Sequence, residues 1–131
     1  MSLAGAGRSQ VAVIANKSVP ADTLQKNQLL DFYTGDIRFW DNDEAVVVFD
    51  LKPQSDVKKA FYHYLGKRSS RMKSIWLKKM LSGEGDPPKA LKTEAEVLTR
   101  VLATRGAIGF LSLTHVNHKD VKVLLVIPAA D

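Results

Sequence analysis

The chain has 131 residues, of which 45% are hydrophobic and 25% are charged, the composition of an ordinary globular domain. It has no cysteine, which excludes disulfides, thiolate metal sites and a cysteine nucleophile. The formal net charge of +5 favours an anionic partner, although a solvated basic surface explains it as well because the charges are spread out. We expect residues 1–9 to be a flexible N-terminal segment and residues 10–131 to form one domain.

The first third of the chain predicts one strand and one helix. Residues 10–15 (QVAVIA) are apolar and predict a strand. A helix is expected over residues 23–33, ended by Gly35, which can adopt a left-handed conformation. Residues 36–44 then form a polar connection, in which Trp40 is expected to be a buried anchor and less readily a residue that stacks on a ligand.

The central stretch, residues 45–65, predicts a strand, a polar turn and a helix. Its first five residues, AVVVF, are a short apolar run without alternation, which indicates a buried strand over 45–49. The apolar residues of the helix follow a helical spacing: Val57, Ala60, Phe61, Tyr64 and Leu65. The helix should begin after Ser55. Free backbone N–H groups at such a helix start can hold an anion, although many such ends bind nothing.

The second half continues the mixture of helices and strands. Helices are expected over residues 70–81, capped by one of two serines, and over residues 93–105, where the sequence TEAE fits a capping box. The residues expected on the inner face of the first are Met72, Ile75, Trp76 and Met80. Residues 82–88 are a loop, and residues 107–111 and 121–127 are strands.

About four strands and four helices, intermixed along the chain, predict an α/β fold: a layered sheet with helices on both faces. The strands near the two ends of the chain are expected to lie close together.

Evidence for catalysis is missing from the sequence. His115 and His118 form an H-x-x-H pair, whose third metal ligand would have to come from Asp120 or from elsewhere, so we favour exposed polar residues over a metal site. His63 is expected in the core or at its boundary. None of the common nucleophile, zinc-protease or dinucleotide motifs occurs. Tyr62 is the one aromatic residue of its helix that the core does not need and that could stack on a nucleic-acid base, so no nucleic-acid partner is expected. No cofactor or metal is expected either.

The order of several short motifs resembles phosphate-type periplasmic substrate-binding proteins of ABC transporters. These motifs are NKSVP at residues 16–20, the run from Leu24 to Gly35 followed by Trp40, then Trp76, GEG at 83–85 and GAIGF at 106–110. The chain has room for little more than one lobe and is similar to the short members of that family. The resemblance implies one lobe of a type II periplasmic binding protein, in a periplasmic or secreted protein whose signal peptide has been removed.

The resemblance also implies where an anion would bind. Ser55 matches the family's phosphate-binding serine, at the start of the central helix. We expect Ser55, with the amides of Asp56 and Val57, to contact a small oxyanion, with charge from Lys52, and Ser18 joins this candidate set.

Other family ligands of phosphate are missing. The family's arginine falls on Leu51, its aspartate on Pro53 and its threonine on Val57, while Asp56 would repel an anion. We therefore expect weak phosphate binding or none.

Two functions remain open at this stage. The first is a non-enzymatic solute-binding domain for phosphate or another small oxyanion. The alternative is an envelope protein-interaction module that kept the fold and lost phosphate binding. Its partner would be an ABC transporter membrane component or another envelope protein, and homo-oligomers also fit. A basic nucleic-acid binder is a third and weaker interpretation.

Overall fold

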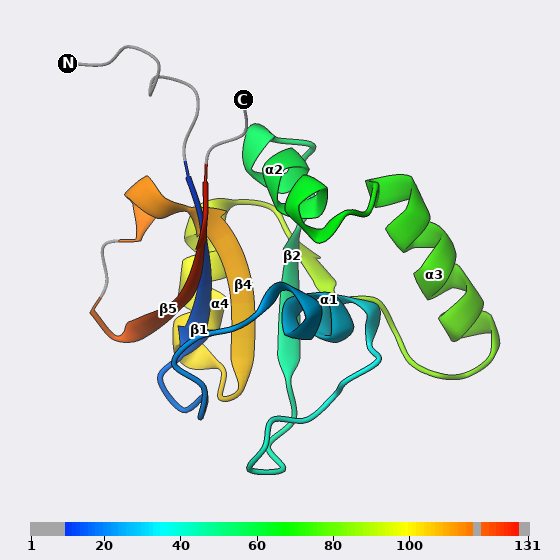
Figure 1. Ribbon diagram of the computed structural model, residues 1–131, viewed down its shortest axis with the longest axis horizontal. Coiled ribbons are helices and arrows are strands. Elements are labelled where there is room, and N and C mark those ends of the chain that lie inside the picture. Colours follow the sequence, from blue (N-terminus) through cyan, green and yellow to red (C-terminus); the bar gives the residue numbers. More distant parts are fainter. Residues whose placement is uncertain (1–9, 117–118, 129–131) are drawn as a thin grey trace.

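The computed structural model describes residues 10–116 and 119–128 of the chain. Figure 1 shows its helices and strands. In chain order they are β1 (Val11–Asn16), α1 (Lys26–Thr34), β2 (Val47–Leu51), α2 (Asp56–Leu65), α3 (Ser69–Leu81), β3 (Lys89–Leu91), α4 (Glu94–Ala103), β4 (Ala107–Ser112), the 3-10 turn η2 (Leu113–His115) and β5 (Val121–Ile127). Within the described residues, no helix is long and apolar enough to cross a membrane.

The five strands form one mixed sheet in the order β3-β2-β4-β1-β5. Strand β2 is parallel to both of its neighbours, β3 and β4. Strand β1 is antiparallel to β4 and to β5, so the two strands nearest the chain ends lie side by side, as predicted. Because β2, β3 and β4 are parallel, their carboxyl ends meet at one edge of the sheet, the upper edge in Figure 1.

Helices cover both faces of the sheet, which confirms the predicted α/β architecture. Neighbouring residues of β4 show this directly, because successive side chains of a strand point to opposite faces. A Cβ added to Gly109 would lie 2.8 Å from Val97 of α4. The next residue, Phe110, stacks on Phe61 of α2, with ring centroids 3.9 Å apart. Helix α1 packs beside α2, and α3 stands out beyond the edge of the sheet (Figure 1).

An aromatic cluster fills the core between the sheet and α2. Phe61 and Phe110 are fully buried and nearly parallel, with an interplanar angle of 7°. Tyr33 meets Phe61 edge to face at 4.8 Å, and Tyr62 does so at 5.5 Å. Offset and edge-to-face contacts of this kind add to the free energy gained by burying the rings. The cluster fixes α2 in place against the sheet.

Several predicted boundaries differ from the structure. Strand β2 begins at Val47 and not at Ala45, because Ala45 forms an isolated bridge with Phe39. Helix α1 begins at Lys26, where Gln25 and Gln28 form a capping box. Strand β3 was not predicted, since it has only three residues and two of them are exposed. The sheet therefore has five strands where about four were expected.

Helix α3 departs from the prediction at its cap and on its inner face. Its N-cap is Arg68 and makes no side-chain hydrogen bond, so the expected serine cap is wrong. Met72 and Trp76 are buried, but Met80 is 43% exposed. Trp76 is held against the protein because its Nε1 donates to the Tyr33 carbonyl oxygen, whereas α3 extends past the edge of the sheet (Figure 1).

Candidate functional site

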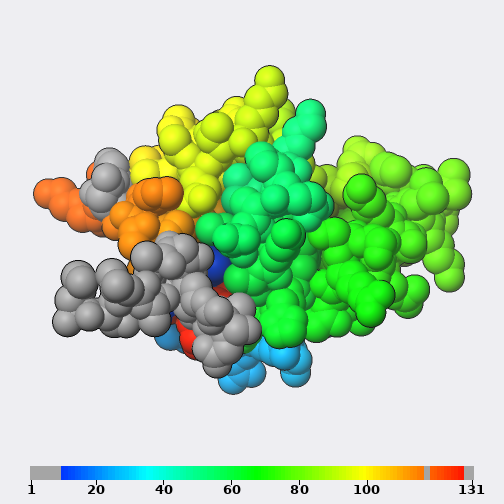
Figure 2. All heavy atoms as spheres, turned by 90° about the horizontal axis from the view of Figure 1, so that it is seen from above, coloured from blue at the N-terminus to red at the C-terminus, as the bar shows by residue number. Residues whose placement is uncertain are grey.

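Helix α2 begins at the edge of the sheet formed by the carboxyl ends of the parallel strands. Ser55 is its N-cap, as predicted, and the Ser55 Oγ accepts a hydrogen bond of 3.2 Å from the Lys58 amide. A serine at this position satisfies one of the free amides of a helix start. Its hydroxyl proton stays available for donation, because a hydroxyl both donates and accepts. Figure 2 looks down on this end of the molecule, where α2 lies at the surface.

Three of the other predicted ligands lie around this helix start. In the part of the chain that the structure describes, the amides of Asp56 and Val57 donate to no other group. The Asp56 and Lys52 side chains are exposed, whereas the Val57 side chain is buried. The amides and the helix dipole favour an anion, and the Lys52 ammonium can approach it from solvent. The Asp56 carboxylate in the first turn opposes the same anion.

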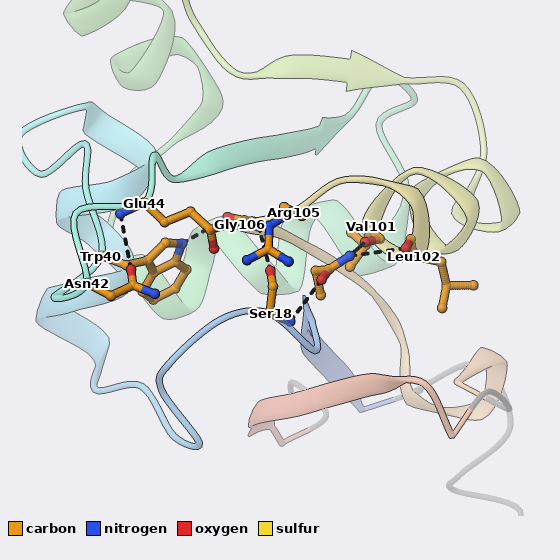
Figure 3. A network of polar contacts seen from close by, with 9 residues as sticks. Ser18, Trp40, Asn42, Glu44, Val101, Leu102, Arg105 and Gly106 are labelled. Atoms are coloured by element: carbon orange, nitrogen blue, oxygen red, sulfur yellow. Dashed lines mark hydrogen bonds and ion pairs between the residues drawn. The ribbon is translucent and has the colours of Figure 1, made fainter.

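Ser18 lies at the other end of the sheet, away from Ser55. It follows β1, and its Oγ accepts a hydrogen bond of 3.0 Å from the Gly106 amide, just before β4 begins. Trp40 Nε1 donates to the Gly106 carbonyl oxygen at 2.9 Å (Figure 3), which confirms Trp40 as a buried anchor. The structure does not bring Ser18 together with the other four candidates. The hydrogen bond between Ser18 and Gly106 instead joins the loop after β1 to the loop before β4.

A buried polar cluster that the sequence did not predict lies next to the helix start. Lys58 is 8% exposed, and its Nζ donates to the carbonyl oxygen of Leu51 at the end of β2. Tyr62, one turn further along α2, donates its hydroxyl to Asp50 Oδ2. Asp50 Oδ1 also accepts from the Leu51 amide at 2.7 Å. Tyr62 is therefore not the free stacking residue that was expected, because it is 5% exposed and bonded to a carboxylate.

One sequence signal could have found this cluster. Lys58 and Tyr62 are spaced i, i+4 and share one face of α2, next to the apolar residues Phe61 and Leu65. A lysine inside an otherwise apolar helical face suggests a buried or half-buried amine. The role of Asp50 could not be read in this way, since its partner is twelve residues away.

Burial raises the pKa of Tyr62, and the nearby Asp50 carboxylate raises it further. Burial likewise raises the pKa of Tyr33, whose hydroxyl donates to the Phe49 carbonyl oxygen at 2.8 Å. A phenol whose folded pKa lies above its unfolded value stays protonated in the native state. Above the unfolded pKa of about 10, the unfolded chain releases these protons and the free energy of unfolding falls.

Replacing Tyr62 with Phe tests this cluster. Tyr62→Phe should lower the free energy of unfolding at pH 7 by about 1–3 kcal/mol, because Asp50 Oδ2 loses its donor inside the protein. The loss of stability above pH 10 should also become shallower, since one of the two perturbed phenols is gone. Urea denaturation at several pH values measures both effects. An unchanged slope above pH 10 would contradict the assignment to Tyr62.

The histidines form no metal site within the described residues. His115 Nδ1 lies 2.8 Å from Glu94 Oε1, and the described residues hold no group of three or more potential metal ligands. His118 lies outside the described residues. His63 is exposed, so its predicted place at the core boundary is wrong. The reason is that Tyr62 and Lys58 occupy the buried side of the helix instead.

Solved phosphate-binding transport proteins have the same fold. A protein of Clostridium perfringens, described as a phosphate ABC transporter substrate-binding protein and solved with bound phosphate, superposes with a TM-score of 0.72 at 21% identity, over 88% of this chain and 45% of its own. An ABC-type phosphate transport receptor of Vibrio cholerae gives 0.69 at 21% identity, over 95% and 52%. PstS of Borrelia burgdorferi gives 0.62 at 14% identity, over 89% and 47%.

These likenesses establish the fold: the chain has the architecture of one periplasmic binding protein lobe, as the motif order predicted. The chain spans about half the length of the structures it matches. No family model matches the sequence, and no curated protein is similar to it. The matched structures are named as transport proteins and not as enzymes.

Proposed function

We propose that the protein is a solute-binding domain that takes phosphate or a similar small oxyanion at the start of α2. One observation carries this proposal: among the described residues the amides of Asp56 and Val57 have no hydrogen-bond acceptor, and they lie with the Ser55 hydroxyl at the edge where parallel strands end. Ligands of open α/β sheets characteristically bind outside the carboxyl ends of the strands. Proteins of similar fold are described as phosphate transport proteins, and one of them was solved with bound phosphate. They support the same class of ligand.

The affinity should be weak. An arginine fork would add a charge-assisted contact, and at this site Leu51 and Pro53 supply no charge. Lys52 supplies the nearby positive charge from an exposed position, where water screens it. We place the protein in the periplasm, where it would work with an ABC transporter membrane component or another envelope protein, without enzymatic activity.

Two substitutions at Ser55 test the proposal without removing the helix cap. Asn and Asp both cap helices well, so Ser55→Asn and Ser55→Asp should fold as the unmodified chain does. The aspartate adds a negative charge where the oxyanion would sit, so Ser55→Asp should abolish phosphate binding. Ser55→Asn keeps a neutral donor and should retain it within about tenfold.

Calorimetric titration with phosphate, sulfate and chloride measures these effects. Saturable heat with phosphate that disappears in Ser55→Asp and survives in Ser55→Asn supports the proposal. No heat at millimolar phosphate with the unmodified chain, or equal heat in both variants, overturns it.

A protein-interaction module is the second candidate function. It is favoured by the exposed apolar residues of helix α3, namely Leu77, Met80 and Leu81. Mass measured across a concentration series tests self-association. A strict monomer that also recovers no partner from envelope extracts would count against this function.

A further inference from the structure

A cleft between α2 and α3 adjoins the start of α2, and Lys58 of the first turn of α2 is among its lining residues. It has a volume of about 370 Å³, within the range of small-molecule sites. Its apolar wall comes mainly from α3, through Met72, Trp76, Leu77 and Met80, and from Pro87 and Pro88 of the following loop. Such a wall suits a hydrocarbon or ring and cannot by itself select one.

Lys58 gives the cleft a charged end. The side chain lines the cleft and is only 8% exposed. Its Nζ can donate three hydrogen bonds, and within the described residues it donates to one oxygen, that of Leu51. No carboxylate of the described residues lies within ion-pair distance of it. A buried ammonium with unused donors favours an anionic group beside it.

The other charges of the cleft agree with an anion. Asp50, the one carboxylate in the lining, already accepts from the Tyr62 hydroxyl and from the Leu51 amide. Lys73 lies on the lining from the α3 side and is exposed. The Lys58 ammonium also lies over the Tyr62 ring, 5.8 Å from its centre. Two cations and one engaged carboxylate leave the cleft net positive.

We propose that this cleft binds a small amphipathic acid, with a carboxylate or phosphate head group against Lys58 and an apolar chain along α3. The head group replaces the water that Lys58 lost on burial. The chain covers Trp76, Leu77 and Met80, two of which are exposed large apolar side chains. The oxyanion at the start of α2 has no apolar body, so the two sites differ in the ligand they accept.

Three probes with the same chain test the proposal: octanoate, octyl phosphate and octanol. The unmodified chain should bind one or both acids at least tenfold more tightly than octanol, because a charge-assisted hydrogen bond contributes about that much. The tighter of the two acids identifies the head group. Calorimetric titration gives the affinities. Equal binding of octanol, or no saturable binding of either acid at millimolar concentration, overturns the proposal.

Two variants locate the site. Lys58→Met keeps the length of the side chain without its charge and should weaken the tighter acid at least tenfold, while binding of octanol is unchanged. Lys59→Met is the matched control, since Lys59 is the exposed neighbour, and it should change nothing. Met80→Glu places a carboxylate at the exposed rim and should also weaken the acid. Acid binding that is unaffected by Met80→Glu, or by a folded Lys58→Met, overturns the assignment.

The Ser55→Asp variant separates this site from the proposed oxyanion site. It should abolish binding of inorganic phosphate and leave binding of octanoate within threefold, on the order expected for a surface charge outside the cleft. Loss of both ligands in Ser55→Asp would show one shared site and overturn the second.

Discussion

Replacing Phe61 with Ala is expected to lower the free energy of unfolding by about 3–5 kcal/mol. Phe61 is fully buried, lies flat against Phe110 and meets the rings of Tyr33 and Tyr62 at their edges. Truncation at this point removes three ring contacts and leaves a cavity between α2 and the sheet. A domain of this size has about 5–15 kcal/mol of stability in total, so the loss is a large fraction of it.

Denaturation by urea measures this loss as a shift of the midpoint at unchanged slope. Two variants on the same helix provide the comparison. His63→Ala changes an exposed residue and should stay within about 0.5 kcal/mol. Phe61→Leu keeps most of the volume and should cost much less than Phe61→Ala. If Phe61→Ala cost no more than His63→Ala, the core would not be centred on this stacked pair.

Much of the fold was predictable because it depends on local sequence patterns. The runs at β1, β4 and β5 are continuously apolar or nearly so, and the structure places each within one residue of the expected bounds. Thr93 caps its helix through the side-chain oxygen, as expected, and Ser55 does so at the expected helix start. The preference of serine for such positions did not suffice at α3, where the cap is Arg68.

The candidate site was predictable only in part, because a sequence does not say which end of a sheet a loop occupies. Ser18 and Ser55 both follow apolar strands. Strand β1 runs antiparallel to β4 and β2 runs parallel to it, so the two serines emerge at opposite ends. The directions of these strands are set by long-range pairing, which no local pattern records.

The Lys58 cluster was missed for a related reason. Burial of an ammonium depends on partners from distant elements, here the carbonyl oxygen of Leu51 and the walls that α3 supplies. Three residues of the α3 wall, Met72, Trp76 and Met80, were expected on the inner face of that helix, but no local pattern placed them opposite Lys58. Helix α2 thus combines two surfaces: its start, with free amides, and its flank, with Lys58.

Replacing Gly106 with Ala should destabilise the protein by about 2–5 kcal/mol. Gly106 has φ +76°, a left-handed conformation that costs an alanine about 1–2 kcal/mol. A Cβ there would also overlap the backbone carbonyl oxygen of Ala45, and overpacking of this kind costs about 1–3 kcal/mol. Relief of the overlap would move the chain that enters β2, because the Val47 amide donates to the Gly106 oxygen at 3.1 Å.

Gly66→Ala is the matched control for Gly106→Ala. Gly66 caps α2 with nearly the same φ, +74°, but no atom lies within 4 Å of its added Cβ. It should therefore cost only the backbone strain of about 1–2 kcal/mol. The difference between the two variants in urea denaturation isolates the contact with Ala45. Equal losses in both would mean that the start of β2 yields freely, and that the Trp40 and Ser18 contacts to Gly106 do not hold this end of the sheet rigid.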